Sequence, residues 1–356
     1  MFVVSQLLLI DGSHPGNVVL NMASSMETQR QKRRVIRVGW EVCKWLVLLG
    51  ILYWIAYRVP QRDWDILISQ PKDYGYLLGA FGLVFVSNVV TFWRWKQLLD
   101  ALEVRFSIWE VIRIGFLGVA LSLVSVGSVG GDVFKALAAA NRSRDRKTEV
   151  VTSVLVDRAI GLLGLVLVAA IALSISSKLS VQMVGIRTGA WVLGLVGLGG
   201  LTAICLFGRA IPTHWVGRLP LVGGVLQRVL ESCLIFQEHR GLAFRMVVSS
   251  LLVHVLATLA CWFVSMGLYV RSAVEVVPTF LEHLQAIPPA LAAATLPLTP
   301  GGLGMQELWI DGLFRQLEGV SSEYSGLVMA TMYRVILILI AGVGGMIYLS
   351  SGRVKA

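Results

Sequence analysis

Six apolar segments, each close to the length of a transmembrane helix, constrain this chain more than any other feature of its sequence. A helix needs about 20 predominantly apolar residues to cross the hydrocarbon core of a bilayer. The sequence predicts such spans at residues 42–59, 75–93, 150–174, 189–207, 246–270 and 326–350. Only 15% of the residues are charged, whereas a soluble domain carries about a quarter. We therefore predict an all-α, polytopic membrane protein, because a transmembrane barrel would show short alternating segments instead.

Two further apolar stretches, residues 109–140 and 281–313, are broken by glycine and proline. The first contains SVGSVGGDVFKA (residues 125–136) and the second contains LPLTPGGLGMQE (residues 296–307). Irregular backbone at membrane depth is tolerated only where it is buried in protein or lines a water-filled cavity. We predict two broken or re-entrant helical elements, the second of them beside a cavity or a protein interface. The alternative for the second is an ordinary extracellular loop in which Thr299 caps the following helix.

Basic residues gather in alternate loops and give the chain a formal net charge of +10. They are densest at residues 30–37, 94–96 and 141–147. Cytoplasmic loops carry an excess of Lys and Arg, so we expect a multi-pass protein of the plasma membrane with both termini in the cytoplasm. In this interpretation the basic residues contact anionic lipid. The sequence contains no basic module interleaved with aromatic residues, and we expect no nucleic-acid partner.

The two halves of the chain share one order of elements. Residues 37–175 and 189–351 each read span, span, broken element, span, and three full spans per half turn the second half over in the membrane. Inverted-topology repeats of this kind are common in secondary transporters. Each half also has an acid after a Gly-Gly pair and an arginine inside the next span. The separation is 26 residues from Asp132 to Arg158 and 27 from Glu307 to Arg334. Chance similarity between Gly-rich apolar segments is the alternative.

Ionisable residues inside the predicted spans are the leading candidates for function. A charge at mid-span costs on the order of 3 kcal/mol on insertion scales, so such residues usually face the protein interior or a substrate pathway. We expect Arg158 to pair with Asp132 or Asp157. We expect Arg334 to pair with Glu307. Each pair is either a structural strut or part of a site in which the arginine also binds a lipid phosphate, and the two roles are compatible.

The broken elements supply further candidates for headgroup binding. Backbone amides of a half-helix that starts after Gly302 could bind an anion such as phosphate. Lys135 shares a helix face with Asp132, and a surface ion pair is the simplest interpretation of the two. Asn88 and His254 are polar residues within spans, and interhelical hydrogen bonds explain them. The remaining candidates in the broken elements are Gly130, Gly131, Thr299, Pro300, Gly301 and Gly304.

Three segments resemble the lysylphosphatidylglycerol synthase transmembrane-region family of flippase-like membrane proteins. They are GGDVFKA…VVTSVLVDRAIGLL, LPLTPGGLGMQE and FWRWKQLL (residues 92–99), within a resemblance that covers roughly residues 37–351. The family's motif positions fall on Arg94, Trp95, Gly131, Asp132, Lys135, Asp157, Arg158, Pro300, Gly301, Gly302, Gly304 and Glu307. Arg94 and Trp95 follow a predicted span, and we expect them at the membrane interface. The first element departs from the family pattern at Val126 and Lys135, where proline and arginine often stand.

The resemblance implies transport of lipid. The family includes the membrane half of bifunctional proteins that aminoacylate phosphatidylglycerol and move the product between leaflets. No aminoacyltransferase domain follows here, so we expect a stand-alone member that is not an enzyme and that translocates an anionic phospholipid or a polyprenyl-linked substrate. The alternatives are a metal-dependent, lipid-modifying transferase and a non-transporting membrane partner of a separately encoded synthase.

The rest of the sequence adds no catalytic chemistry. The cysteines and histidines lack metal-ligand spacing, and no ATP-binding motif is present, so we predict no metal, cofactor or catalytic residue. Residues 1–36 are expected to be a disordered or misannotated segment that ends in a basic juxtamembrane run. Residues 37–351 form the flippase-like transmembrane domain, and residues 352–356 form a short basic tail.

Overall fold

The computed structural model of the protein describes residues 61–122, 129–176, 179–210, 223–269, 277–295, 299 and 302–350. The predicted span at residues 42–59 and the two predicted terminal segments lie outside these residues. Every regular element in the described part of the chain is a helix. The prediction of an all-α fold is therefore confirmed.

Five helices are long and apolar enough to cross a membrane, and they match the five predicted spans that the structure describes. They are α4 (Tyr74–Ala101), α7 (Lys147–Ile175), α8 (Val181–Phe207), α12 (Arg240–Leu268) and α15 (Gly326–Ser350). Two of them begin at side-chain caps, which satisfy amide groups that a helix start leaves without a partner. Asp73 accepts from the amide of Gly75 at 2.8 Å, and Ser180 accepts from that of Met183 at 3.2 Å.

Each broken stretch forms a pair of short helices. The first pair is α5 (Ile108–Ser122) and α6 (Val129–Arg142), and the second is α13 (Phe280–Ala294) and α14 (Met305–Phe314). The prediction that the helices break at both glycine motifs is therefore confirmed. The remaining short elements are α3 (Gln61–Ile68), η1 (Arg144–Arg146), η2 (Gly208–Ala210), α10 (Gly223–Cys233) and α11 (Ile235–Glu238).

Glycines shape both broken elements in different ways. A Cβ atom on Gly131 would lie 2.4 Å from the carbonyl oxygen of Gly118, so the backbones of α5 and α6 touch where a side chain would not fit. At the start of α14, Gly302 and Gly304 have φ angles of 68° and 80°. This left-handed conformation is one that glycine adopts readily and other residues rarely do.

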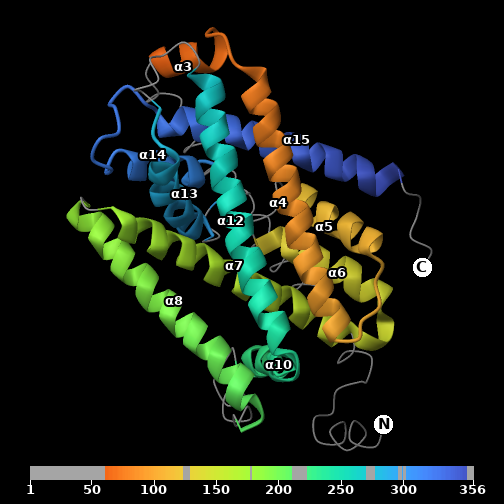
Figure 1. Ribbon diagram of the computed structural model, residues 1–356. Coiled ribbons are helices and arrows are strands. Elements are labelled where there is room, and N and C mark those ends of the chain that lie inside the picture. Colours follow the sequence, from red (N-terminus) through yellow and green to blue (C-terminus); the bar gives the residue numbers. More distant parts are fainter. Residues whose placement is uncertain are drawn as a thin grey trace, which may run out of the picture. The chain divides into compact units, whose positions relative to one another are not determined.

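The helices of the two halves pack reciprocally. α4 lies along α12 (Figure 1), and each broken element contacts the span that follows it, α6 on α7 and α14 on α15. Each broken element also packs on the corresponding span of the other half, α5 on α15 and α13 on α7. Two inverted repeats related by a pseudo-two-fold axis produce this pattern of contacts.

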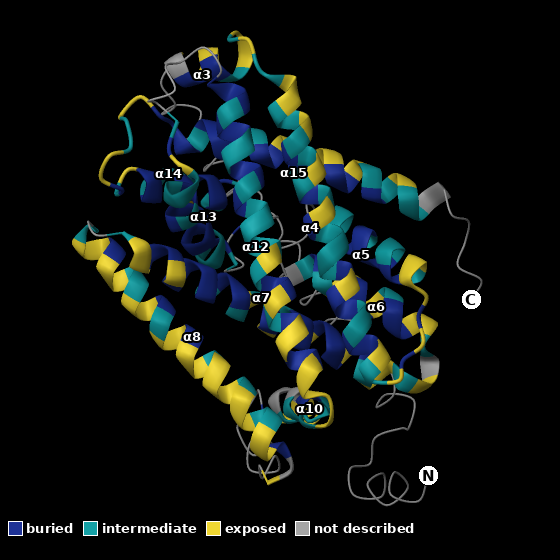
Figure 2. Cartoon of the chain, viewed as in Figure 1, coloured by how far each residue is buried: buried dark blue, intermediate teal, exposed yellow. Residues whose placement is uncertain are grey.

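α8 is the least buried of the five candidate spans. Figure 2 shows exposed residues along most of its length, while α7 and α13 are largely buried. The buried side of α8 faces α7, where a Cβ atom on Gly194 would lie 3.0 Å from Leu167. Its exposed residues are mainly apolar. In a membrane protein, such a surface is suited to contact with lipid acyl chains, which are as apolar as leucine.

Candidate functional site

A buried cluster of charges joins α4, α6 and α7. Arg94 donates from Nε to Asp157 Oδ1 at 2.8 Å and from Nη2 to the backbone carbonyl of Asp157 at 3.1 Å. Lys135 Nζ lies 3.6 Å from the other carboxylate oxygen of Asp157. All three residues are buried: Arg94 is 3% exposed, and Asp157 and Lys135 are each 5% exposed. One carboxylate therefore faces two cations, and the cluster carries a net charge of +1 when all three groups are ionised.

Arg94 and Trp95, which were predicted at the membrane interface, are both buried against protein, and their depth in the membrane stays a prediction. α4 continues two turns past the predicted end of its span, to Ala101, and these residues face α7 within the helix. Trp95 donates from Nε1 to Ser153 Oγ of α7 at 3.0 Å. A buried indole N–H generally needs such a partner. Both residues therefore hold α4 against α7.

Lys135 is also placed differently from the prediction. It is buried, so a surface ion pair with Asp132 is wrong. Its Nζ atom lies 4.0 Å from the centre of the Trp95 ring and 3.6 Å from Asp157. The face of an indole ring attracts a cation, most strongly where water is excluded. Lys135 thus ties α6 to both neighbouring helices.

The pair formed by Arg158 and Asp132 is more open. Arg158 donates from Nη1 to Asp132 Oδ2, which joins α7 to α6. Of the two acids that the sequence left open as partners, Asp132 is confirmed, while Asp157 is bound by Arg94. The side chains of Arg158 and Asp132 are 26% and 29% exposed. This pair can therefore be reached by a ligand without dismantling the buried cluster beside it.

A cavity of about 240 Å³ lies at this point, between the buried charge cluster and the pair of Arg158 and Asp132. Its charged wall consists of Arg94, Asp132, Asp157 and Arg158. The rest of the wall comes from α4, α7, α12 and α13, through Thr91, Gly161, Leu162, Leu165, His254, Leu291 and Thr295. Gly161 and His254 lie at the midpoints of α7 and α12. The cavity therefore reaches the middle of two candidate spans.

Two polar residues of this wall, His254 and Thr91, were not predicted as site residues. His254 Nε2 lies 2.9 Å from the carbonyl oxygen of Gly161, which confirms the predicted interhelical bond, but the ring also lines the cavity. Asn88, which does not line the cavity, was predicted to form a hydrogen bond between helices. This prediction is wrong, because Asn88 donates to the carbonyl of Val84 within α4 at 2.9 Å.

The second charge pair, Arg334 with Glu307, is sealed inside the protein. Arg334 donates from Nε to Glu307 Oε1 at 2.7 Å, which confirms the predicted pair. Its Nη2 group donates to Gln306 Oε1 at 2.9 Å and to the carbonyl of Gly302 at 3.3 Å. The side chains of Arg334 and Glu307 are 9% and 7% exposed. These bonds fasten the start of α14 to α15.

Glu307 also closes the start of α14. Its Oε2 atom accepts from the amide of Gly304 at 2.8 Å. The residue before the helix is thus Gly304, and the alternative in which Thr299 caps the helix is wrong. Thr299 is buried, and its Oγ1 atom has no hydrogen-bond partner among the described residues. The Glu307 carboxylate therefore accepts from an amide at the start of this half-helix, where a bound anion such as phosphate was predicted.

The remaining predicted candidates are scattered. Gly131 packs against α5 and does not line the cavity, while Gly130 is half-buried at the start of α6. Pro300 and Gly301 lie outside the described residues. The structure therefore brings the predicted residues together as two separate clusters, one around Arg158 and one around Arg334. Their roles toward a headgroup stay predictions.

A hydrogen-bonded group of buried side chains joins α13 to α12 and to the segment that precedes α15. Ser265 Oγ of α12 lies 2.8 Å from His283 Nε2 of α13 and 2.7 Å from the hydroxyl of Tyr324. All three side chains are buried. A fully satisfied polar network of this type rigidifies the elements that it joins. This network therefore lies in the same half as the sealed pair of Arg334 and Glu307.

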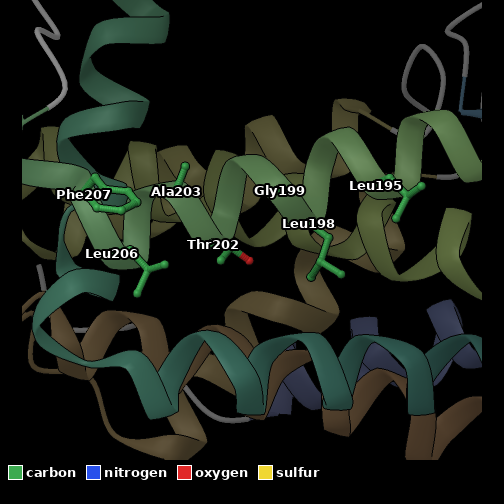
Figure 3. Close-up of a pocket in the computed structure, with 7 residues that line it drawn as sticks. All are labelled: Leu195, Leu198, Gly199, Thr202, Ala203, Leu206 and Phe207. Atoms are coloured by element: carbon green, nitrogen blue, oxygen red, sulfur yellow. The ribbon is translucent and has the colours of Figure 1, made fainter.

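A second pocket lies along α8 and differs in character from the cavity. Figure 3 shows the side chains that line it, and Thr202 is the one polar side chain among them. They are Leu195, Leu198, Gly199, Thr202, Ala203, Leu206 and Phe207, all from α8. No charged residue lines this pocket. Its chemistry suits contact with hydrocarbon and not with a headgroup.

Comparison with known proteins identifies the family of the chain. A family model described as the lysylphosphatidylglycerol synthase TM region matches residues 41–345, which is most of the chain. No curated protein and no solved structure matches the chain significantly. The match covers both broken elements, the charge pairs and all five candidate spans up to the last turn of α15. The chain belongs to the lysylphosphatidylglycerol synthase transmembrane-region family.

Proposed function

We propose that this protein moves an anionic phospholipid or another lipid-linked anion between the two leaflets, with Arg158 as the group that contacts the phosphate. The observation that carries the proposal is the cavity beside the partly exposed pair of Arg158 and Asp132, which reaches the middle of α7 and α12. Transporters commonly place the polar part of their substrate near the bilayer midplane, at the interface between repeats.

The pair of Arg158 and Asp132 offers a simple exchange of partners. A guanidinium group binds carboxylate and phosphate with the same planar fork of donors. Asp132 therefore satisfies Arg158 while no lipid is bound, and a phosphate takes its place when a headgroup enters. The arginine is never left without a counter-charge, which would be costly at membrane depth.

The difference between the two charge pairs suggests how the cavity changes sides. In the described conformation, the pair in the first half lines a cavity and the pair in the second half is sealed. The reciprocal packing of the halves allows a second conformation with these roles exchanged, so that Arg334 lines a cavity and Arg158 is sealed. Movement between two such states is the usual form of alternating access in proteins built from inverted repeats.

The basic loops give the proposal a direction. α6 ends at Arg142 and is followed by Arg144, Arg146 and Lys147. Cytoplasmic loops carry an excess of basic residues, so we assign this end of α6 to the cytoplasmic side. We propose that the protein lies in the plasma membrane with both termini in the cytoplasm, and the pair of Arg158 and Asp132 then belongs to the repeat whose broken element enters from that side. Under this proposal the chain forms no covalent bond, and a separately encoded synthase supplies the lipid.

Leaflet exchange in reconstituted liposomes tests the proposal. The wild-type protein should accelerate exchange of a fluorescent phosphatidylglycerol, measured as loss of fluorescence to a membrane-impermeant reductant. Arg158→Gln should slow the exchange by about tenfold or more, because a hydrogen bond to a charged group contributes about 1.5–3 kcal/mol. Arg142→Gln is the matched control, since it removes one positive charge from an exposed pair with Glu110.

Two results would overturn the proposal. The first is a wild-type protein that exchanges no anionic phospholipid faster than protein-free liposomes do. The second is an Arg158→Gln variant that is folded and exchanges lipid at the wild-type rate.

A further inference from the structure

His254 presents a hydrogen-bond acceptor to the cavity. The carbonyl oxygen of Gly161, 2.9 Å from Nε2, can only accept, so the proton of the ring must be on Nε2. A neutral imidazole has one donor and one acceptor, which leaves the lone pair on Nδ1. The Nδ1 atom makes no hydrogen bond within the part of the chain that the structure describes, and the residue lines the cavity.

Two threonines of the same wall are acceptors as well. Thr91 donates its hydroxyl proton to the carbonyl of Ser87 at 2.9 Å, one turn back in α4. Thr295 donates to the carbonyl of Ala292 at 2.7 Å. A hydroxyl group has one proton and two lone pairs. With the protons committed to backbone carbonyls, each threonine has only lone pairs left to offer the cavity.

The cavity therefore has two chemically different sides. Arg158 provides donors that suit a phosphate, and three neutral side chains, two from α4 and α12 and one directly after α13, provide acceptors. A ligand that satisfies both sides combines a phosphodiester with a neighbouring hydrogen-bond donor. A ligand without the donor would bury these acceptors unpaired, and sites built to bond a polar group reject analogues that lack it.

We propose that His254, supported by Thr91 and Thr295, selects phospholipid headgroups that carry a hydrogen-bond donor beside the phosphate, either a hydroxyl or a primary ammonium group. The inference rests on the proposed function, because it assigns the substrate class of the same cavity. It makes His254 a specificity-determining residue, distinct from Arg158, which binds the phosphate of any phospholipid.

Competition between matched lipids tests this inference. Purified protein is equilibrated at about pH 8, where an ordinary imidazole is neutral, with equal amounts of phosphatidylglycerol and phosphatidylmethanol, and the retained lipid is measured by native mass spectrometry. Both lipids are singly charged phosphodiesters, but only phosphatidylglycerol has headgroup hydroxyls. The wild-type protein should retain phosphatidylglycerol about fivefold more, as expected for one additional hydrogen bond of about 1 kcal/mol.

A variant isolates the contribution of the ring. Glutamine at position 254 can still donate to the carbonyl of Gly161 from its amide nitrogen, but it places no acceptor where Nδ1 stands. His254→Gln should therefore lower the retention ratio to about one, because phosphatidylglycerol loses its additional hydrogen bond. Arg158→Gln should reduce the retention of both lipids together.

A second lipid pair identifies the kind of donor. Phosphatidylethanolamine carries a primary ammonium group, and phosphatidylcholine carries none that can donate. Preference for phosphatidylglycerol over phosphatidylmethanol supports a hydroxyl donor, and preference for phosphatidylethanolamine over phosphatidylcholine supports an ammonium donor. Equal retention within both pairs by the wild-type protein overturns the inference, as does an unchanged ratio in folded His254→Gln protein. Selective retention without leaflet exchange would overturn transport alone, and exchange without selective retention would overturn this inference alone.

Discussion

Replacing Asp157 by asparagine tests the buried charge cluster with almost no change in side-chain volume. The substitution leaves Arg94 and Lys135, 3% and 5% exposed, without the carboxylate that faces both of them. Removal of one partner from a buried ion pair costs about 3–5 kcal/mol, because the other charge stays buried and uncompensated. We expect Asp157→Asn to lower the free energy of unfolding by about 4 kcal/mol.

Two matched substitutions set the scale. Arg94→Gln leaves Asp157 facing Lys135 at 3.6 Å, so a counter-charge remains and the cost should be about 2 kcal/mol. Arg142→Gln breaks an exposed pair with Glu110 and should cost less than about 1 kcal/mol. The assay is thermal unfolding of detergent-solubilised protein followed by tryptophan fluorescence. With about 2–4 °C per kcal/mol, the expected decreases in Tm are about 8–16 °C, about 4–8 °C and under about 4 °C.

The order of the three decreases in Tm tests whether Asp157 balances both cations. A decrease for Asp157→Asn no larger than that for Arg94→Gln would refute the reasoning that one carboxylate serves two cations. Shifts within about 2 °C of the wild type for all three variants would show that the cluster is exposed to water in solution.

The remaining predictions concern the second charge pair and one helix contact. Arg334→Gln should lower the apparent Tm more than Arg158→Gln does, because its pair with Glu307 is less than a tenth exposed, and equal shifts would contradict the distinction between a sealed and an open pair. Gly164→Ala should cost about 1–3 kcal/mol by overpacking, because its Cβ would lie 2.1 Å from Ser250 Oγ. Gly185→Ala, with no atom within 4 Å of the new Cβ, is its control and should be neutral or slightly stabilising. Wild-type stability of the Gly164→Ala protein would rule out the close contact of α7 with α12.

Most of the fold could be predicted from the sequence because the bilayer limits the possible elements. Apolar length predicted the five spans that the structure describes, and glycine motifs predicted both helix breaks. The pairs of Arg334 with Glu307 and Arg158 with Asp132 were predictable for a related reason. A charge inside an apolar helix requires a partner, and few acids are available at that depth.

The burial of Arg94 against α7 could not be predicted in this way. A basic residue after an apolar run is typical of a membrane interface, but α4 continues past it to Ala101. The end of a helix and the face that it buries depend on the helices packed against it, which hydropathy does not record. One signal was available, because Trp95, Leu98 and Leu99 lie three and four residues apart and form a buried face. That spacing predicts that the helix continues and packs against protein.

The acceptor wall of the cavity could not be predicted at all. Thr91 of α4, His254 of α12 and Thr295, directly after α13, are distant from one another in sequence. Each is an ordinary polar residue in its own segment. Their common property is the direction of their hydrogen bonds, which exists only once the backbone carbonyls that accept their protons are in place. Tertiary structure is needed to see that they leave lone pairs on one cavity.

The packing of α5 against α15 has a consequence for how the protein is made. α5 belongs to the first broken element, and α15 is the last helix in the described part of the chain. During synthesis, the first broken element enters the membrane long before its covering helix leaves the ribosome. Until then the face of α5 that α15 covers, which includes Phe116, must be shielded by lipid, the insertion machinery or another protein. A chain truncated before α15 would leave that surface uncovered, and we expect the cell to degrade it as a misfolded protein.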